Sequence, residues 1–337
     1  MGSGRAMVLR AANLALELQD RPAPQARRGE AVVRLRASSV NYHDVLGLQG
    51  KIRGALYPRV PFSDGCGEVV AVGDDVTRVK PGDRVMPNFF AHWIAGPPTP
   101  EALTIVHGDQ IDGCLQTHAT FKDTALVAAP DHLSDVEAAT LGCAGLTAWR
   151  SLVVDARVKP GDIVVAQGTG GVSLFALGFA KMLGATVILT SSSDEKLERG
   201  RELGADHTIN YRSQDWARRV LEITDGRGAD HLLDVGGPET LPAAIKAAKL
   251  GGFISVIGVL TGEEQPVFPL RAVMSKNLTV KGLTVGSRSD FDEMSKAVSA
   301  ARYHPVVEQV FDLENAGEAI SAMQARGHMG KLAIRIS

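Results

Sequence analysis

The chain has 337 residues, of which 45% are hydrophobic and 22% charged, and its formal net charge at pH 7 is −2. Its length suits two globular domains, and the near balance of 36 basic and 38 acidic residues gives no support to binding of nucleic acid or of an anionic membrane surface. Three widely spaced cysteines, Cys66, Cys114 and Cys143, argue against a disulfide framework and predict a reducing, cytoplasmic compartment.

The first part of the chain, residues 5–130, is rich in turns and short alternating runs. Residues 30–36 and 67–72 alternate apolar and polar side chains, and proline and glycine separate the runs. This pattern is typical of short β-strands joined by tight turns. We therefore expect a β-rich domain here.

From about residue 134 the pattern changes to alternating strands and helices. Strands are predicted at 163–167, 186–190, 231–235, 253–259 and 278–285, with helix-length segments between most of them. Alternating βαβ units predict a parallel, doubly wound α/β sheet with right-handed crossovers. Helices near 290–301 and 315–325 and a closing strand at 331–336 are expected to rejoin the first domain. The predicted domains are therefore 1–133 with 288–337, and 134–287.

A glycine cluster inside the second domain predicts dinucleotide binding. Gly168, Gly170 and Gly171 follow an apolar strand and open an amphipathic helix, so the backbone can turn sharply beside a pyrophosphate. The N-terminus of that helix offers unpaired N–H groups and the positive end of its dipole to the anion. Ser173 stands where a third glycine often lies. An ordinary glycine-rich turn is the alternative.

The end of the following strand favours NADPH over NADH. An NAD site usually places an acidic residue there, whereas this strand runs into Thr190, Ser191, Ser192 and Ser193. The first carboxylate, Asp194, falls in the first turn of the next helix, where Ser192 and Glu195 would form a capping box. Hydroxyl groups with Lys196 nearby suit a 2′-phosphate, which a carboxylate would repel. The alternatives are that the serines only cap the helix, or that they do both.

Several further motifs occur in a recognisable order along almost the whole chain: Ser39-Val-Asn-Tyr-His-Asp, Asp64-Gly-Cys-Gly-Glu-Val-Val-Ala-Val-Gly, Pro81-Gly-Asp-Arg-Val, Ala138-Ala-Thr-Leu-Gly-Cys-Ala-Gly-Leu-Thr-Ala-Trp, Gly168-Thr-Gly-Gly-Val, Leu203-Gly-Ala-Asp and Gly251-Gly. With them the chain resembles the medium-chain dehydrogenase/reductase superfamily. The resemblance implies a GroES-like β domain beside a Rossmann cofactor domain, with the active site where the two meet.

The same resemblance bears on zinc. Zinc-dependent members bind the metal through a Cys, a His and a Cys, and the matching positions here hold Asn41, Ser63 and Cys143. One thiolate cannot hold a catalytic zinc, which needs three protein ligands. The region of the structural zinc lobe, 88–117, contains one cysteine, Cys114. We therefore expect no metal. An improvised site from His43, Asp64, Cys66 and Cys143 stays open as an alternative.

Without a Lewis acid, simple alcohol oxidation becomes harder and hydride transfer to an electrophilic acceptor becomes natural. The resemblance is strongest to zinc-free quinone oxidoreductase-type members, which implies an NADPH-dependent reductase of a quinone or an α,β-unsaturated carbonyl. The alternatives are alcohol and carbonyl interconversion, enoyl-thioester reduction, or NADPH binding without catalysis. Arg53 and Arg59 flank the Asn41 segment, but no concentrated basic patch favours a CoA thioester.

The resemblance assigns cofactor contacts to many positions. The glycine turn is assigned to the pyrophosphate. The serines at the strand end, with Lys196, Tyr211 and Arg326, are assigned to the 2′-phosphate, and the other residues of the set to the nicotinamide end. Each of the four 2′-phosphate residues Ser191, Lys196, Tyr211 and Arg326 has a solvated surface role as its alternative. The full set is Thr147, Gly168, Thr169, Gly170, Gly171, Val172, Ser191, Ser192, Lys196, Tyr211, Gly258, Val259, Leu283, Val285 and Arg326.

For the chemistry, Asn41 is the first candidate, because it replaces a zinc ligand and can hydrogen-bond a substrate carbonyl or the cofactor ribose. Tyr42 and Asp44 lie in the same turn, where a Tyr or His would protonate an enolate. For His43 and Asp44 a turn-stabilising pair is the alternative, and a quinone needs only a proton from solvent.

Three aromatic residues of the long 88–117 insertion, Phe89, Phe90 and Trp93, are candidates for the substrate pocket, where they would stack on a flat acceptor. The alternative is that they anchor the loop. Relatives often form homodimers through the edges of their cofactor-domain sheets, and the strand from Phe253 is compatible with such an edge. A buried central strand would look the same.

Overall fold

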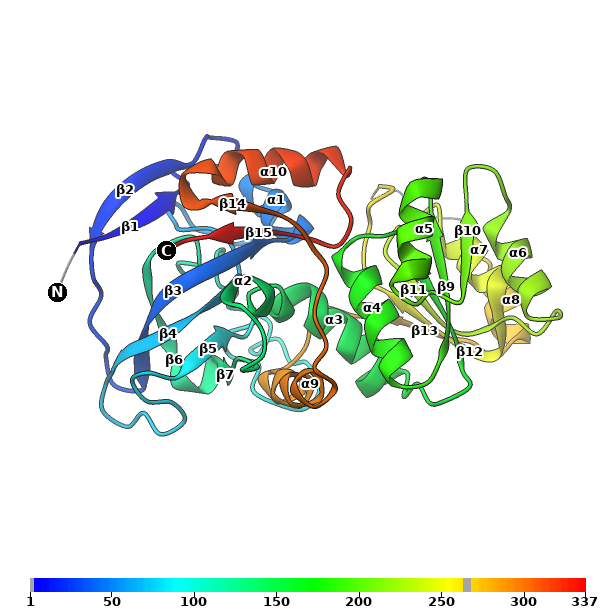
Figure 1. The fold of residues 1–337 in the computed structure, drawn as a ribbon, viewed down its shortest axis with the longest axis horizontal. Helices are drawn as coiled ribbons and strands as arrows, with labels where there is room; N and C mark the ends of the chain where they lie inside the picture. Colours follow the sequence, from blue (N-terminus) through cyan, green and yellow to red (C-terminus); the bar gives the residue numbers. More distant parts are fainter. Residues whose placement is uncertain (1–2, 263–267) are drawn as a thin grey trace. The chain divides into compact units, whose positions relative to one another are not determined.

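The computed structural model describes residues 3–262 and 268–337, which form two compact units (Figure 1). Unit 1 comprises residues up to Leu146 together with Val285–Ser337, and unit 2 comprises Thr147–Thr284. Residues 134–146, which the sequence places with the cofactor domain, belong to unit 1, because the short helix α2 (Asp135–Ala138) packs on strands of that unit.

Unit 1 is built on strands, as the turn-rich sequence predicts. A seven-stranded sheet has the order β14-β15-β3-β4-β5-β7, with β6 also pairing with β3, and β1 and β2 form a separate antiparallel pair. The strands are β1 (Ser3–Val8), β2 (Glu17–Pro22), β3 (Glu30–Val40), β4 (Asp64–Val72), β5 (Arg84–Pro87), β6 (His118–Lys122), β7 (Leu126–Ala128), β14 (Val307–Asp312) and β15 (Lys331–Arg335).

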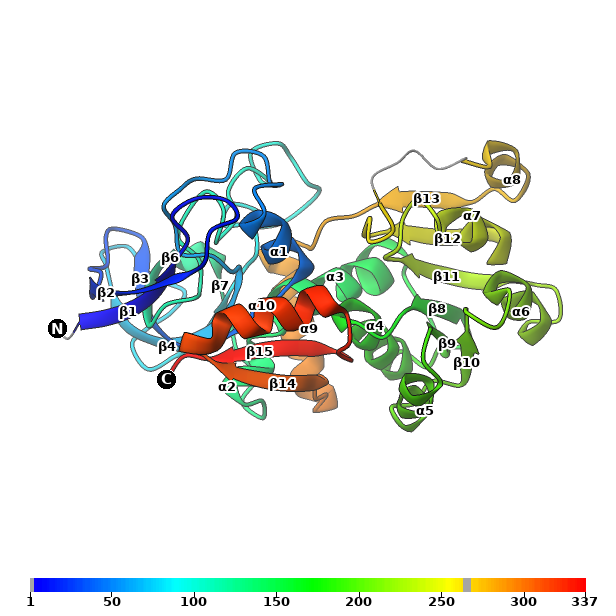
Figure 2. The ribbon, with the colours of Figure 1, turned by 90° about the horizontal axis from the view of Figure 1, so that it is seen from above.

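The long strand β3 organises unit 1, because β15, β4 and β6 all pair with it. Its C-terminal half is buried almost continuously, and Leu35 belongs to a core cluster with Phe62, Phe121, Leu332 and Ile334. The helices and 3-10 turns of this unit are α1 (Tyr42–Leu48), α2, Asp123–Ala125, α9 (Arg288–Ala301), Leu313–Asn315 and α10 (Ala316–Ala325), and a π-helical turn spans Leu141–Gly145. Figure 2 shows α10 beside β14, β15 and α1.

Unit 2 is a six-stranded parallel sheet in the order β10-β9-β8-β11-β12-β13. Numbered from β8, this order is 3-2-1-4-5-6, which is the doubly wound nucleotide-binding arrangement. The predicted α/β sheet is confirmed. Its strands are β8 (Ile163–Gln167), β9 (Thr186–Ser191), β10 (His207–Asn210), β11 (Ala229–Asp234), β12 (Ala248–Val256) and β13 (Thr279–Gly282).

Helices cover both faces of the unit 2 sheet (Figure 1). Helices α4 and α5 pack on β8, β9 and β10, and an apolar cluster joins the other face to α6 and α7. The helices are α3 (Leu146–Trp149), which crosses the unit boundary, then α4 (Gly171–Met182), α5 (Asp194–Glu202), α6 (Trp216–Ile223), α7 (Leu241–Ala247) and α8 (Leu270–Ser275), and a π-helical turn spans Arg150–Asp155.

The bounds of one expected strand need correction here. The strand expected at 253–259 spans Ala248–Val256 and lies between β11 and β13, so of the two alternatives left open it is the inner strand and not a dimer edge. Buried inner strands and edge strands share the same apolar composition, which is why the sequence did not separate them.

In the described ranges no helix is long and apolar enough to cross a membrane.

Candidate active site

The polar residues at the end of β3 form a buried network in unit 1. Asn41 follows the strand directly and is only 6% exposed. Its side-chain amide donates to Asp64 Oδ2 at 2.8 Å, and the Ser39 hydroxyl donates to the same oxygen at 2.6 Å. Strand pairing explains this meeting, because β3 and β4 are antiparallel and Ser39 lies opposite Asp64.

Lys331 belongs to β15, the other strand that pairs with the C-terminal end of β3, and it completes the network. Its Nζ atom donates to Asn41 Oδ1 at 2.5 Å and to the Val40 carbonyl at 2.8 Å, and it lies 3.5 Å from Asp64 Oδ2. In β15, Leu332 pairs with Val40, so the register places Lys331 beside Asn41. A buried ammonium therefore faces a buried carboxyl group and the amide oxygen of Asn41.

Asp44 lies in the first turn of α1 and holds the start of that helix. Its Oδ2 atom accepts from the Asn41 backbone N–H at 2.7 Å, and Oδ1 accepts from the Ser63 N–H at 3.3 Å. Burial raises the pKa of Asp44 from the ordinary 3.8 to about 7, the charge of His43 opposes the rise, and that of Asp64 adds to it. This carboxyl group can therefore hold a proton near neutral pH, and its contact with the Asn41 N–H also serves the helix start.

The other two predicted members of the turn point elsewhere. The Arg326 guanidinium donates to the Tyr42 hydroxyl at 3.5 Å and lies 5.6 Å from the centre of its ring. His43 Nε2 meets Asp109 Oδ2 at 2.6 Å, so it pairs with the 88–117 insertion and not with Asp44 as the turn-stabilising alternative supposed. Burial lowers the His43 pKa, but the hydrogen bond and charge of Asp109 outweigh it and the pKa is raised.

The residues at the zinc-ligand positions do not fit a zinc ion. Burial, reinforced by Asp64, raises the pKa of the Cys143 thiol, which disfavours the thiolate that zinc requires. Asn41 Oδ1 is already occupied by the ammonium of Lys331, which would repel a second cation. Within the described residues no group of three His, Cys, Asp or Glu side chains is placed to hold a metal.

That finding also covers the alternative metal site of His43, Asp64, Cys66 and Cys143. Two of its members are held by contacts with other residues. His43 turns to Asp109, and Cys66 Sγ lies 3.6 Å from Asp135 Oδ1. Cys114, which is not a member of that set but the one cysteine of the 88–117 region, is fully buried with its Sγ atom 3.5 Å from the Ser63 carbonyl.

The aromatic residues of the insertion are interior side chains of unit 1. Phe89, Phe90 and Trp93 are between 1% and 6% exposed, and their rings contact one another at tilted or edge-on angles. Phe89 also meets the edge of His43, and the Trp93 indole donates to the Gly96 carbonyl at 2.9 Å. These contacts are the ones that loop anchoring requires, and the substrate role of the three residues stays a prediction.

In unit 2 the glycine turn has the geometry that a pyrophosphate needs. Gly168 adopts φ +77°, a conformation that side chains disfavour, and a Cβ atom added at Gly168 or Gly170 would meet nothing within 4 Å. Helix α4 begins at Gly171 with Gly170 as its N-cap, and no side chain caps its first N–H groups. The Ser173 hydroxyl donates to the Gln167 carbonyl at 2.5 Å, so this small residue ties the helix to β8.

Two polar side chains at the strand-order reversal have buried atoms without partners among the described residues. Gln167 ends β8 and leaves both amide atoms unsatisfied, and Asp234 ends the neighbouring β11 with Oδ2 unsatisfied. Ligands bind at this point in doubly wound sheets, and unsatisfied buried groups are costly unless a ligand or water meets them. The unit 2 residues therefore fit a dinucleotide.

The serine cluster after β9 differs in detail from the prediction. Asp194 lies in the first turn of α5 as expected, but the N-cap is Ser193, whose hydroxyl accepts from the Lys196 N–H at 3.3 Å. The capping box of Ser192 and Glu195 is therefore wrong by one position, because the strand runs one residue further than expected, through Ser191, and the helix begins one residue later, at Asp194. Ser192 is half-buried and is not needed as the cap.

The other 2′-phosphate candidates divide between the units. Tyr211 is 47% exposed and its backbone N–H pairs with the Ser191 carbonyl at 3.1 Å, so strands β9 and β10 bring these residues together. Arg326 belongs to unit 1 at the C-terminal end of α10. Phosphate binding by these residues stays a prediction.

The residues assigned to the nicotinamide end lie at strand ends or near the unit boundary. Thr147 and Leu283 are buried in unit 2, and Val285 is buried in unit 1 with φ +38°. Gly258 follows β12, where a Cβ atom would lie 2.4 Å from the Val235 carbonyl oxygen, whereas Val259 is 47% exposed. Thr169, Gly171 and Val172 belong to the glycine turn and the start of α4.

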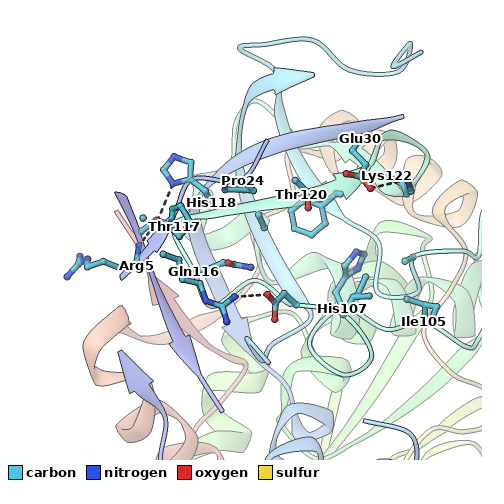
Figure 3. A pocket seen from close by; sticks show the side chains of 18 of the residues that line it. Arg5, Pro24, Glu30, Ile105, His107, Gln116, Thr117, His118, Thr120 and Lys122 are labelled. Atoms are coloured by element: carbon cyan, nitrogen blue, oxygen red, sulfur yellow. Dashed lines mark hydrogen bonds and ion pairs between the residues drawn. The ribbon is translucent and has the colours of Figure 1, made fainter. Parts of the chain in front are cut away.

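A separate hollow of about 410 Å³ lies on unit 1 beside β1, β2 and β6 (Figure 3). It is lined by none of the predicted site residues. Its rim charges are paired, since Lys122 contacts Glu30 and Arg21 contacts Asp112. The hollow therefore offers no unpaired charge of these residues to a ligand.

Sequence reasoning missed Gln167, Asp234 and Lys331. A polar residue ending an apolar strand was a weak signal for the first two. For Lys331 the signal was a lysine at the first position of a strand whose next three residues are apolar.

The family described as Alcohol dehydrogenase GroES-like domain matches residues 27–131, and that described as Zinc-binding dehydrogenase matches residues 171–300. The Schizosaccharomyces pombe zinc-type alcohol dehydrogenase-like protein C1773.06c is 42% identical over 315 residues, which cover 91% of each chain.

Solved structures agree over the whole chain. A Sinorhizobium meliloti 1021 protein provisionally described as an alcohol dehydrogenase is 40% identical, with a TM-score of 0.95 and 100% coverage of both chains. An NAD-dependent alcohol dehydrogenase is 32% identical, with a TM-score of 0.90, and the match covers 99% of this chain and 100% of that one.

Proposed function

The chain belongs to the medium-chain dehydrogenase/reductase superfamily and is an alcohol dehydrogenase-like oxidoreductase, and from this premise we propose a zinc-independent, NADPH-dependent reductase of a quinone or an α,β-unsaturated carbonyl. The observation that carries the proposal is the donor set at the end of β3. Where zinc-dependent members place a metal ligand, this chain places the Asn41 amide between Lys331 and Asp64.

That arrangement suits an acceptor that carries its own electrophilic carbon. Of the two N–H bonds at Asn41 Nδ2, one points to Asp64, and no second acceptor for this group is present among the described residues. The remaining N–H can donate to a carbonyl oxygen, whose negative charge grows as hydride arrives at the conjugated carbon. Asp44, whose carboxyl group accepts from the Asn41 backbone N–H, has a raised pKa. A proton held there near neutral pH can be passed to the reduced substrate.

A nicotinamide cofactor, when bound, supplies the hydride. Gly168, Gly170 and the N-terminus of α4 would hold its pyrophosphate, and the serine cluster after β9 with Lys196 and Tyr211 would hold a 2′-phosphate. The absence of a carboxylate at Thr190–Ser193 supports NADPH.

Alcohol and carbonyl interconversion is the second candidate, because the similar proteins are named as alcohol dehydrogenases, one of them NAD-dependent. A CoA-thioester role finds less support. Arg59, one of the two arginines that flank the Asn41 segment, is 2% exposed and donates to the Gly47, Leu56 and Gly108 carbonyls, so it is not available to a CoA phosphate.

The test is oxidation of NADPH and of NADH, followed by nicotinamide absorbance, against quinones, enones, aldehydes and enoyl thioesters. We expect turnover of quinones or enones with NADPH and little turnover of aldehydes. Faster reaction of aldehydes or alcohols would favour the second candidate, and a preference for NADH would refute the serine argument. Tight NADPH binding without turnover of any acceptor would indicate the non-catalytic alternative.

We also propose a homodimer in the cytoplasm. Among the described strands β13 is an edge of the unit 2 sheet, and large apolar side chains nearby are exposed, with Leu270 at 68% and Met274 at 70%. An edge strand beside such a surface suits pairing with a second copy. All three cysteines are unpaired thiols, which agrees with a reducing compartment.

A further inference from the structure

Lys331 is an unusual side chain for the protein interior. It is 2% exposed as a residue, and its ammonium has three oxygen neighbours, namely Val40 O, Asn41 Oδ1 and Asp64 Oδ2. Burying an ammonium is costly unless it is paired and hydrogen-bonded, and here both conditions are met.

The Lys331 ammonium and the Asp64 carboxyl group hydrogen-bond to opposite ends of the Asn41 side-chain amide. Asn41 Oδ1 accepts from Lys331, while Asn41 Nδ2 donates to Asp64. A rotated amide would place its NH₂ group against the ammonium and its oxygen against the carboxyl group. Both contacts would then be repulsive, so the two residues select one orientation of Asn41.

We propose that Lys331 is a positioning residue that takes the place of a metal cation, fixing the Asn41 amide so that its free N–H faces the substrate oxygen. The inference rests on the proposed function for its catalytic part. Lys331 does not touch the substrate. It acts through Asn41, by holding the amide and by drawing electron density toward Oδ1, which makes the remaining N–H a better donor.

The assignment of Lys331 as the source of positive charge in this network follows from the charges of its neighbours. Ser39 donates to Asp64, and Asp44 accepts from two backbone N–H groups, so neither brings positive charge to the network. The described contacts of Asp64 include one cation, Lys331. An internal ammonium therefore supplies the charge that the zinc-dependent members obtain from a bound ion.

The test is a double-mutant cycle on turnover with Lys331→Met and Asn41→Ala. We expect Lys331→Met to lower kcat roughly 10- to 100-fold with the native Asn41, which is less than the roughly 100- to 1000-fold loss of an oxyanion donor because the donor stays present but misplaced, while KM for NADPH is unchanged. In the Asn41→Ala background the same substitution should change kcat by less than about twofold, because the residue it positions is gone. Equal losses in both backgrounds, or none in the first, would overturn the proposal.

A matched control is available in unit 2. Lys276 Nζ donates to three backbone carbonyls, those of Ile245, Lys246 and Ala248, and has no part in the site. Lys276→Met removes a comparable set of lysine hydrogen bonds, and we expect kcat to be unchanged. If Lys331→Met yields no folded protein, Lys331→Gln keeps a donor without the charge and takes its place in the cycle.

A second readout separates this inference from the proposed function. The Asn41 side-chain amide gives a pair of ¹H–¹⁵N signals, identified by their loss in Asn41→Ala. We expect these signals to move in Lys331→Gln and to stay in place in Lys276→Met. If wild-type protein reduces no acceptor but the signals move, the proposed function fails while the positioning role stands. Unmoved signals would refute the positioning role whatever the activity.

Discussion

The raised pKa of Asp44 makes a specific prediction about stability and pH. In the folded chain this pKa is about 7, against an ordinary value of 3.8, a difference of about three units. At about 1.4 kcal/mol per unit, the ionised group costs the folded state about 4 kcal/mol.

The sign follows from proton binding. Between pH 4 and pH 7 the folded state holds a proton on Asp44 that the unfolded state has lost, so the free energy of unfolding falls as pH rises through this window. This contribution is fully present below pH 4 and lost above pH 7. Asp44→Asn removes the titration, so its stability relative to wild type should rise by up to about 4 kcal/mol between pH 4.5 and pH 7.5.

The assay is urea unfolding of both proteins at several pH values across that window. The control is Asp215→Asn at the start of α6, because the Lys246 hydrogen bond lowers the pKa of Asp215. The contribution of Asp215 is therefore lost only at more acidic pH, and its difference from wild type should stay constant in the window. A flat difference for Asp44→Asn as well would show that the carboxyl group is ionised in the folded protein at low pH, which would refute the reasoning.

Three further predictions concern unit 2. Ser191→Asp restores a carboxylate at the end of β9, so we expect kcat/KM for NADPH to fall at least roughly tenfold relative to NADH, and an unchanged ratio of the two values would count against the phosphate pocket. Gln167→Leu removes two unsatisfied polar atoms, so the free energy of unfolding of the cofactor-free protein should rise by about 1 kcal/mol or more. Cofactor affinity, measured by titration, should weaken. Met274→Lys should dissociate the dimer in sedimentation, and a dimer that persists would exclude the β13 surface as the interface.

The parts of the site that depend on local sequence were predictable. The strand, glycine turn and helix from Ile163 to Met182 follow one another without interruption, and their hydrophobic period and turn residues are local properties. The place of Asp194 in the first turn of α5 was predicted for the same reason. The cap itself was misplaced by one residue, since the end of a strand depends on the length of its partner.

The insertion shows the limit of composition as a guide. Phe89, Phe90 and Trp93 suit either a ligand surface or a buried anchor, because large aromatic side chains serve both roles. Burial depends on what the fold places around them, and in unit 1 the rings are covered by one another and by His43.

The sequence by itself determined a two-part chain with a doubly wound nucleotide-binding sheet, and it showed that the zinc-ligand positions hold Asn41, Ser63 and Cys143. Only the tertiary structure decided what stands beside Asn41. Lys331 lies 290 positions further along the chain and reaches Asn41 through the antiparallel register of β3 and β15. Hydrophobic periodicity reports which residues share a face of one element, whereas the pairing of distant strands is set by the packing of the whole unit.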